Sequence, residues 1–337
     1  MSVLLEARGV IKEFRSAAGW PGRRTAAFQA VAGVDLQVNR GETLALVGES
    51  GSGKTTLARC LMRLVEPTAG EIRFDGRDLR ALPAAALRAE RRRFQMVFQD
   101  PHSSLNPRLR IGSMLAEPIR VHRLRPRAEI AARVAELLEL VGLPPTAAAQ
   151  YPHEFSGGQR QRLGIARALA TEPELLVADE PVSALDVSIR AQIVNLLVAL
   201  QRRYGLALLF ITHDLALVEH LADRVAVMYR GRIVEEAPNA ALFATPRHPY
   251  TRALLRAVPR VRPASAGEGL READPGASGA EDAVVSGGCA YRPRCDRASA
   301  RCAREIPLLV PPAGAHRYAC FHPLDPETDR NFSPREP

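Results

Sequence analysis

One nine-residue segment constrains this chain more than any other. The stretch GESGSGKTT, residues 48–56, matches the phosphate-binding pattern G-x-x-x-x-G-K-[ST] at every fixed position. An apolar run, ETLALV, precedes it, and a run with apolar residues at helical spacing, TTLARCLMRL, follows it. Strand, glycine loop and helix in this order form the setting that the pattern needs. We therefore expect an α/β protein with a phosphate-binding P-loop.

The residue types of this loop predict a site for nucleotide phosphates. Backbone N–H groups of the loop and the start of the following helix attract phosphate oxygens. Lys54 is expected to reach the β and γ phosphates, and Thr55 to offer its hydroxyl to Mg²⁺. The predicted phosphate-binding set is Gly48, Glu49, Ser50, Gly51, Ser52, Gly53, Lys54, Thr55 and Thr56.

A second apolar run ends in two carboxylates. ELLVADEP, residues 174–181, reads as a buried strand that terminates in Asp179 and Glu180. A carboxylate at a strand end beside a P-loop is placed to hold Mg²⁺, as a Walker-B aspartate does. Glu180 follows directly and is placed to orient or deprotonate an attacking water.

Two further strand-like runs end in polar side chains. LLFITHDLA, residues 208–216, places Thr212 and His213 at its end, and RFQMVFQDP, residues 93–101, places Gln99. In open α/β sheets, nucleotides bind outside the carboxyl ends of the strands. We therefore expect these groups to join Asp179 and Glu180 in one phosphate-handling site.

The segment HEFSGGQRQRLGIARALA, residues 153–170, raises a separate question. A serine and two glycines open an amphipathic, arginine-rich run, which predicts a helix whose N-terminus faces an anion. The chain already has a phosphate cradle about a hundred residues earlier. Either this helix faces a different phosphate, or the glycines only cap a loop.

Composition describes an ordinary globular chain. It has 337 residues, of which 46% are hydrophobic, and no uncharged apolar run long enough to span a bilayer. Glu6 and Arg8 interrupt the apolar start, so we predict no secretory signal and a cytosolic location. The net charge of +9 suggests nucleic acid, an anionic membrane surface, or compositional bias. Arginine supplies nearly all the basic residues and is scattered, which favours bias.

Taken together, these motifs resemble those of ABC-type ATPases, over roughly residues 3–258. In that family Gln99 is the Q-loop, Ser156–Gln159 the signature, Ser183–Asp186 the D-loop and His213 the switch. The resemblance implies a P-loop NTPase domain over residues 1–258. Such a domain has a mixed sheet core, a helical signature subdomain near residues 100–170 and an antiparallel β subdomain.

The resemblance also implies how the site works. ABC ATPases pair head to tail, so the signature of one domain closes over the ATP of the other. Glu180 would hold the attacking water, with His213 and Gln99 near the γ-phosphate. The implied Mg²⁺ ligands are Thr55, Gln99 and Asp179, and Ser156, Gly157 and Gly158 are implied to touch the γ-phosphate of a partner's ATP. Gln159 and Asp186 are further implied nucleotide-binding residues.

An aromatic residue near the N-terminus has two interpretations. Phe14 stands where the family places a side chain that stacks on adenine, and it could equally be a buried core residue. The segment WPGRRTAAF, residues 20–28, resembles a loop insertion. Trp20 within it is a weaker candidate for the same stacking role.

Longer stretches resemble the ATP-binding subunits of dipeptide, oligopeptide and nickel importers, and specifically the F-type subunit. They are FQDPHSSLNPRLRIGSMLAEPI and YPHEFSGGQRQRLGIARALATEPELLVADEPVSALDVSIRAQIVNLL. The implied partners are a paralogous ATPase, two membrane permeases docking near residues 99–122, and an extracytoplasmic solute-binding protein. The implied location is the cytoplasmic face of the inner membrane.

Alternatives to this assignment stay open. A homodimer is compatible with the complete motif set. The solute could be a peptide, nickel, glutathione or an opine-like compound, because binding protein and permeases select it. A soluble ABC ATPase acting on nucleic acid or ribosomes is the rival class, but the chain has one P-loop and no heptad run, so we expect no nucleic acid partner.

The C-terminal part carries a different pattern. Residues 259–287 are predicted to be a flexible linker, residues 288–323 a cysteine-rich extension and residues 324–337 a tail. Four clustered cysteines in a cytosolic protein favour a metal over disulfides, whereas Cys60 is expected in the core. The family resemblance implies a [4Fe–4S] cluster; Zn²⁺, a disulfide or free thiols are the alternatives. The proposed ligands are Cys289, Cys295, Cys302 and Cys320.

Overall fold

The structure is a computed structural model. It describes residues 2–15, 27–100, 104–258, 287–309 and 315–325. Trp20, nearly all of the predicted linker and most of the predicted tail lie outside these residues.

A seven-stranded mixed sheet forms the centre of the molecule. Its strand order is β11-β10-β9-β3-β8-β7-β6. The pairs from β9 to β6 are parallel, and β10 joins β9 and β11 as antiparallel neighbours. All residues of β3, β7 and β8 are buried, which explains why their sequences read as continuous apolar runs. The bounds are β3 Thr43–Val47, β6 Phe94–Val97, β7 Leu175–Asp179, β8 Ala207–Thr212, β9 Arg224–Tyr229, β10 Arg232–Pro238 and β11 Arg317–Tyr318.

A second, antiparallel sheet covers one side of the P-loop helix. Its order is β2-β1-β4-β5, and α1 (Lys54–Leu61) follows the P-loop directly. Apolar residues of this sheet, of α1 and of the central sheet form one core, which includes the fully buried Cys60. The predicted core position of Cys60 is confirmed. The strands are β1 Val3–Arg15, β2 Ala27–Asn39, β4 Ala69–Phe74 and β5 Arg77–Asp78.

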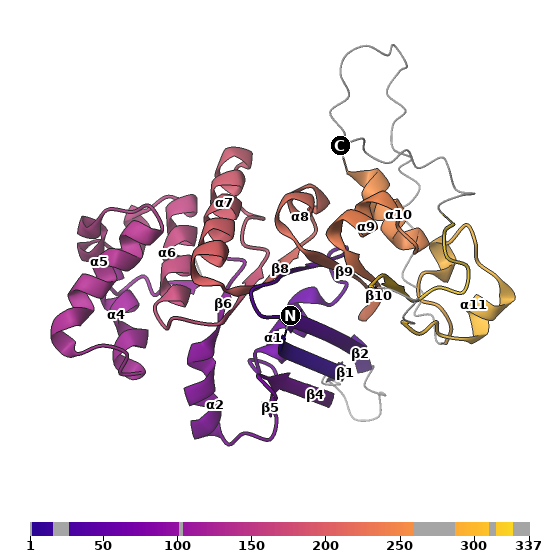
Figure 1. Cartoon of the computed structure of the whole chain (residues 1–337), viewed down its shortest axis with the longest axis horizontal. Helices are drawn as coiled ribbons and strands as arrows, with labels where there is room; N and C mark the ends of the chain where they lie inside the picture. Colours follow the sequence, from indigo (N-terminus) through magenta and orange to yellow (C-terminus); the bar gives the residue numbers. More distant parts are fainter. Residues whose placement is uncertain (1, 16–26, 101–103, 259–286, 310–314, 326–337) are drawn as a thin grey trace, which may run out of the picture.

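The middle of the chain folds into the predicted helical region. Figure 1 shows α4, α5 and α6 grouped at one end of the molecule, beside α7. A single apolar core joins these helices to β6, β7 and β8. The helices are α2 Ala84–Glu90, α4 Ile111–Val121, α5 Ile130–Leu140, α6 Gly157–Leu169 and α7 Val187–Tyr204. Short 3-10 helices are η1 Arg91–Arg93, η2 Arg127–Glu129, η3 Pro145–Ala149 and η4 Pro152–Glu154.

The C-terminal residues extend the central sheet at its other end. β11 pairs with β10, and the N–H of Ala319 donates to the carbonyl oxygen of Val234 at 2.8 Å. Figure 1 shows α11 at the end of the molecule opposite to α5. The remaining elements are α8 Leu215–Leu221, α9 Asn239–Ala244, α10 Pro249–Ala257, η6 Arg292–Arg294 and α11 Ala300–Arg304.

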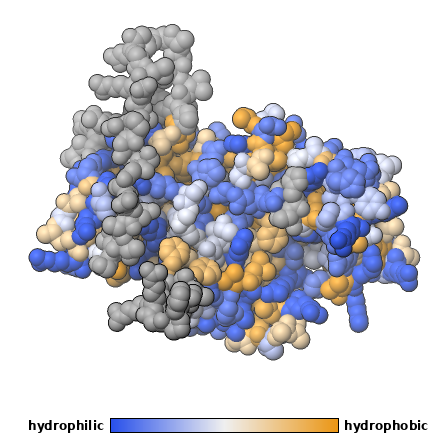
Figure 2. All heavy atoms as spheres, turned by 180° about the vertical axis from the view of Figure 1, so that it is seen from behind, coloured by the Kyte–Doolittle hydropathy of each residue, from blue (hydrophilic) through white to orange (hydrophobic). Residues whose placement is uncertain are grey.

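The face drawn in Figure 2 carries residues of both polarities. On the face in Figure 2, hydrophilic residues are interspersed with smaller hydrophobic groups. Within the described ranges, we find no helix of the length and apolarity that crossing a membrane requires.

Candidate functional site

The P-loop backbone is possible only with glycine at two positions. Gly48 has φ +152°, and a Cβ atom there would lie 2.1 Å from the carbonyl oxygen of Met228. Gly53 has φ +106°, and its Cβ would lie 2.2 Å from the carbonyl oxygen of Ala30. Since heavy atoms cannot approach so closely, these glycines allow the loop to lie against neighbouring backbone. The loop is thus built by tertiary contacts as well as by its own sequence.

The side chain of Lys54 is buried and crosses the loop. Its Nζ donates to the carbonyl oxygens of Gly48 at 2.7 Å and Glu49 at 2.9 Å. Burial lowers the pKa of Lys54, and the nearby carboxylates of Glu180, Asp179 and Glu49 oppose that change. An ammonium held inside the curve of the loop is suited to bind phosphate oxygens.

Asp179 and Thr55 come together at the end of β7. The hydroxyl of Thr55 donates to Oδ1 of Asp179 at 2.8 Å. Asp179 is almost completely buried, and burial raises the pKa of its carboxyl. A carboxylate and a hydroxyl are oxygen ligands of the kind that Mg²⁺ prefers. The residues present therefore fit the Mg²⁺ that the sequence predicts.

Glu180 lies at the centre of a three-residue cluster. Nε2 of Gln99 donates to its Oε2 at 3.1 Å, and Nδ1 of His213 lies 3.4 Å from its Oε1. Glu180 has φ +44°, a left-handed conformation that is strained for a residue with a side chain. The parallel ladder of β6, β7 and β8 brings the three groups together from distant parts of the sequence.

The signature residues form a capped helix start. The Ser156 hydroxyl accepts from the N–H of Gln159 at 3.3 Å, and Oε1 of Gln159 accepts from the N–H of Ser156 at 2.9 Å. This reciprocal pair is a capping box, and the first turn of α6 carries no acidic residue. Ser156 and Gln159 are exposed. The positive end of the helix therefore faces outward, as an anion site requires.

Three other predicted residues lie at exposed positions. Asp186 occupies the N-cap position of α7 and is exposed, as is the His213 ring. Phe14 is 43% exposed, so the interpretation of Phe14 as a core residue is wrong. Nζ of Lys12 lies 5.0 Å from the centre of the Phe14 ring. An exposed ring is compatible with stacking on a base, and that role stays a prediction.

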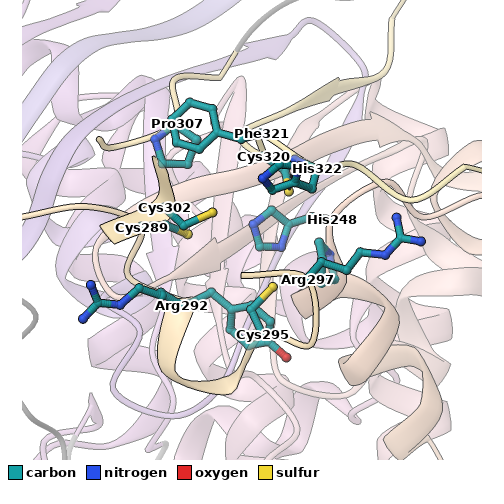
Figure 3. Close-up of a pocket in the computed structure, with 12 residues that line it drawn as sticks. His248, Cys289, Arg292, Cys295, Arg297, Cys302, Pro307, Cys320, Phe321 and His322 are labelled. Carbon is teal, nitrogen blue, oxygen red and sulfur yellow. Dashed lines mark hydrogen bonds between the residues drawn. The ribbon is translucent and has the colours of Figure 1, made fainter. Parts of the chain in front are cut away.

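The four C-terminal cysteines line one pocket. Figure 3 shows Cys289 beside Cys302, and Cys320 beside His322, around the same cavity as Cys295. Burial raises the pKa of Cys289, Cys295 and Cys320, which favours the neutral thiol. In the residues that the structure describes, no three His, Cys, Asp or Glu side chains are gathered closely enough to hold a metal ion. The thiols supply a donor set without the closed geometry of a metal site.

Two residues at the P-loop escaped the sequence analysis. Tyr250 Oη accepts from the N–H of Glu49 at 2.9 Å, and Arg294 forms an ion pair with the Glu49 carboxylate. Both lie about two hundred residues or more from the loop in sequence. No local motif marks them, and only the extension of the central sheet by C-terminal elements brings them there.

Comparison with known proteins assigns the chain to a family. Residues 31–183 match the ABC transporter family, and residues 234–302 match the family of the oligopeptide/dipeptide transporter C-terminal region. A probable peptide ABC transporter ATP-binding protein of Sinorhizobium fredii is 50% identical over 98% of this chain and 93% of its own length. The chain belongs to the ABC transporter ATP-binding proteins.

Other relatives of this ABC ATPase agree. A putative peptide import ATP-binding protein of Brucella ovis is 49% identical over 94% of this chain and 97% of its own length. The glutathione import ATP-binding protein GsiA of Escherichia coli K12 is 55% identical over 77% of this chain and 42% of its own length. An ATP-binding cassette solved as a dimer bound to ADP and Pi superposes with TM-score 0.63 and 28% identity, over 70% of this chain and 99% of that one. The predicted fold and ATPase activity are confirmed.

Proposed function

We propose that this ABC ATPase energises the import of peptides, as a peripheral subunit on the cytoplasmic face of the inner membrane. The observation that carries the proposal is the 50% identity, over nearly the whole chain, to a protein named for peptide transport. The match of residues 234–302 to the oligopeptide/dipeptide C-terminal region supports it. The relationship to GsiA makes glutathione, itself a short peptide, the second candidate solute.

The geometry supports a mechanism for hydrolysis. Lys54 binds and neutralises the phosphates, while Thr55 and Asp179 would hold the Mg²⁺, which stabilises charge on the transferred phosphoryl group. The Glu180 carboxylate orients a water in line with the γ-phosphate and accepts its proton. Gln99 and His213 fix the carboxylate from both sides.

We infer that hydrolysis requires a second ATPase domain, packed head to tail. The support is that several predicted nucleotide-contacting groups lie at the surface of this chain: the signature, Asp186 and His213. Val187, next to Asp186, is 79% exposed, which is unusual for a large apolar residue. The partner is a paralogous subunit or a second copy of this chain.

A pair of glycine substitutions on one helix tests the role of the signature. A Cβ at Gly157 would meet only Leu185, at 3.6 Å, so Gly157→Ala is expected to fold normally but to obstruct close approach of a phosphate. We expect unchanged ATP binding and a hydrolysis rate reduced about tenfold. This is less than the loss expected when one donor to the reacting group is removed completely, because the added methyl group only weakens the contact. Gly164→Ala, with nothing within 4 Å, is the control and should hydrolyse ATP normally. Equal rates in both variants would contradict the head-to-tail model.

A groove beside the Q-loop supports the proposed permease contact. It has a volume of about 380 Å³, and part of its lining comes from the predicted docking region: Met114, Glu117, Pro118 and Val121. Val121 is 59% exposed. An apolar groove of this kind fits a short amphipathic helix of a membrane subunit.

Reconstitution tests both the cargo and the contact. Vesicles containing this chain, its partner ATPase, the permeases and the binding protein should show ATPase stimulation by peptide-loaded binding protein. Val121→Arg should remove that stimulation while the unstimulated hydrolysis persists. Stimulation by a nickel or opine-like solute but not by peptides or glutathione would overturn the peptide assignment.

We also propose that residues 288–323 are a distinct metal-binding extension of the ATPase domain at residues 1–258. The support is the donor set of Cys289, Cys295, Cys302 and Cys320 around one pocket. Four thiolates suit a [4Fe–4S] cluster or Zn²⁺, but the enclosed space is only about 10 Å³, room for one water. Any bound group would therefore require the thiols to move.

Metal analysis decides this point. The chain purified without oxygen should contain about four irons and inorganic sulfide per molecule if the cluster forms. One zinc per chain, without iron, would show that the four cysteines form a zinc site and not an iron–sulfur cluster. If the purified chain contains neither iron nor zinc, the proposal that the extension binds a metal is wrong.

A further inference from the structure

The P-loop is contacted by two residues from the C-terminal part of the chain. Glu49, the first variable residue of the loop, donates its N–H to Oη of Tyr250 at 2.9 Å. Its carboxylate accepts two hydrogen bonds from the guanidinium of Arg294, at 2.9 and 3.0 Å. Paired parallel hydrogen bonds between these groups are stronger and more directional than a single one. Both the backbone and the side chain of Glu49 are thus fixed from outside the ATPase motifs.

A cluster of three tyrosines with tilted and edge-on rings packs around this contact. The ring centres of Tyr229 and Tyr250 lie 4.5 Å apart, and that of Tyr291 lies 5.4 Å from each. All three rings are buried. The guanidinium of Arg294 lies 5.8 Å from the centre of the Tyr291 ring. Packing in this tyrosine cluster therefore restricts where Arg294 and the hydroxyl of Tyr250 can lie.

The ion pair between Arg294 and Glu49 affects the charge that the P-loop presents to the nucleotide. A carboxylate on a loop that binds phosphates repels them, and Arg294 supplies the opposite charge at hydrogen-bonding distance. The hydrogen bonds that Arg294 donates to Glu49 raise the pKa of Arg294, so the arginine remains charged. Removal of Arg294 would leave the Glu49 carboxylate unpaired, on a loop released from one of its two anchors.

We propose that Arg294 and Tyr250 are positioning residues for the P-loop, and that η6 and α10, which carry them, set the affinity of this subunit for ATP. Neither residue contacts the reacting atoms. They act through Glu49, by neutralising its charge and by holding the start of the loop in the conformation that binds phosphates. The proposal rests on the nucleotide site and is independent of the transported solute.

The decisive experiment is ATP binding and hydrolysis by the purified full chain. We expect Arg294→Met to raise the Kd and KM for Mg-ATP about threefold to fivefold, the size of one partly exposed ion pair, with little change in kcat. Arg294→Met combined with Glu49→Gln should return the Kd toward wild type, because the unpaired carboxylate is removed as well. Arg294→Lys should give an intermediate value.

Two matched variants separate positioning from folding. Arg252→Met breaks the 2.7 Å ion pair between Arg252 on α10 and Asp296, two residues after Arg294. This control variant should leave the Kd for Mg-ATP unchanged. Tyr250→Phe should raise the Kd for Mg-ATP while keeping the packing of the three aromatic rings. An unchanged Kd in Arg294→Met, or no recovery in the double variant, would overturn the proposal. Since binding is measured directly, a failure of peptide import leaves this result standing.

Discussion

The two ends of the same parallel strands are used in opposite ways. At the carboxyl ends of β6, β7 and β8, Gln99, Glu180 and His213 form a partly exposed cluster with long contacts of 3.1 and 3.4 Å. At the amino ends of β6 and β7, Arg93 and Glu174 form a tight ion pair at 2.5 Å. The side chains at the carboxyl ends can bind a ligand in place of one another, whereas the charges at the amino ends are already paired.

The ion pairs at the amino end belong to a network. Arg40 and Arg93 each bind both Glu174 and Asp75, with separations from 2.5 to 2.7 Å. Hydrogen bonds from Arg93 lower the pKa of Glu174 and of Asp75. This network ties the central sheet to the turn after β4 in the antiparallel sheet. We therefore expect substitutions at the carboxyl end to alter chemistry, and those at the amino end to alter stability.

The largest effect is expected for Glu180→Gln. The amide keeps the size of the side chain but cannot accept the proton of the attacking water, so ATP hydrolysis should fall at least about 100-fold. ATP binding should persist and the closed dimer should accumulate. Phosphate release and size-exclusion chromatography with ATP measure the two outcomes. Turnover at the wild-type rate would remove Glu180 from the catalytic role.

Lys54→Ala should act on binding rather than on the chemical step. Loss of a charged, buried donor is expected to weaken Mg-ATP binding about tenfold to a hundredfold. Equilibrium dialysis of the purified chain measures it. Lys54→Arg should not restore binding, since the planar guanidinium does not fit the space of a compact ammonium. Full affinity in Lys54→Ala would show that the loop backbone alone holds the phosphates, and full affinity in Lys54→Arg would show that a guanidinium can take the place of the ammonium.

The smallest effect is expected for Glu174→Gln at the amino end. Because the pairs are about one third exposed, we expect a loss of only about 0.5–1 kcal/mol in unfolding free energy, with unchanged kcat. Glu139→Gln, on the exposed face of α5, is the control.

The pH dependence of this loss has a defined sign. The folded pKa of Glu174 lies below its ordinary value of 4.5, so the stabilisation is complete above pH 4.5 and is lost as the pH falls through the lowered value. Denaturant titrations at pH 7 and at acidic pH measure it. A kcat change in Glu174→Gln at pH 7 would break the division of roles between the two strand ends.

The sequence by itself determined the fold class and the order of the motifs, and it predicted the residues of the nucleotide site. These follow from local rules: a glycine pattern between a strand and a helix, and apolar runs that end in polar groups. It also predicted that a helix begins at the signature, and the structure places α6 there with a capping box between Ser156 and Gln159.

Only the tertiary structure decided which distant groups meet. The exposure of Phe14 and the attachment of Arg294 and Tyr250 to Glu49 depend on strand order and on the packing of α10 and η6. Such contacts join residues up to 245 positions apart in sequence. Local propensity is set within a few residues along the chain, so it carries no information on these pairings.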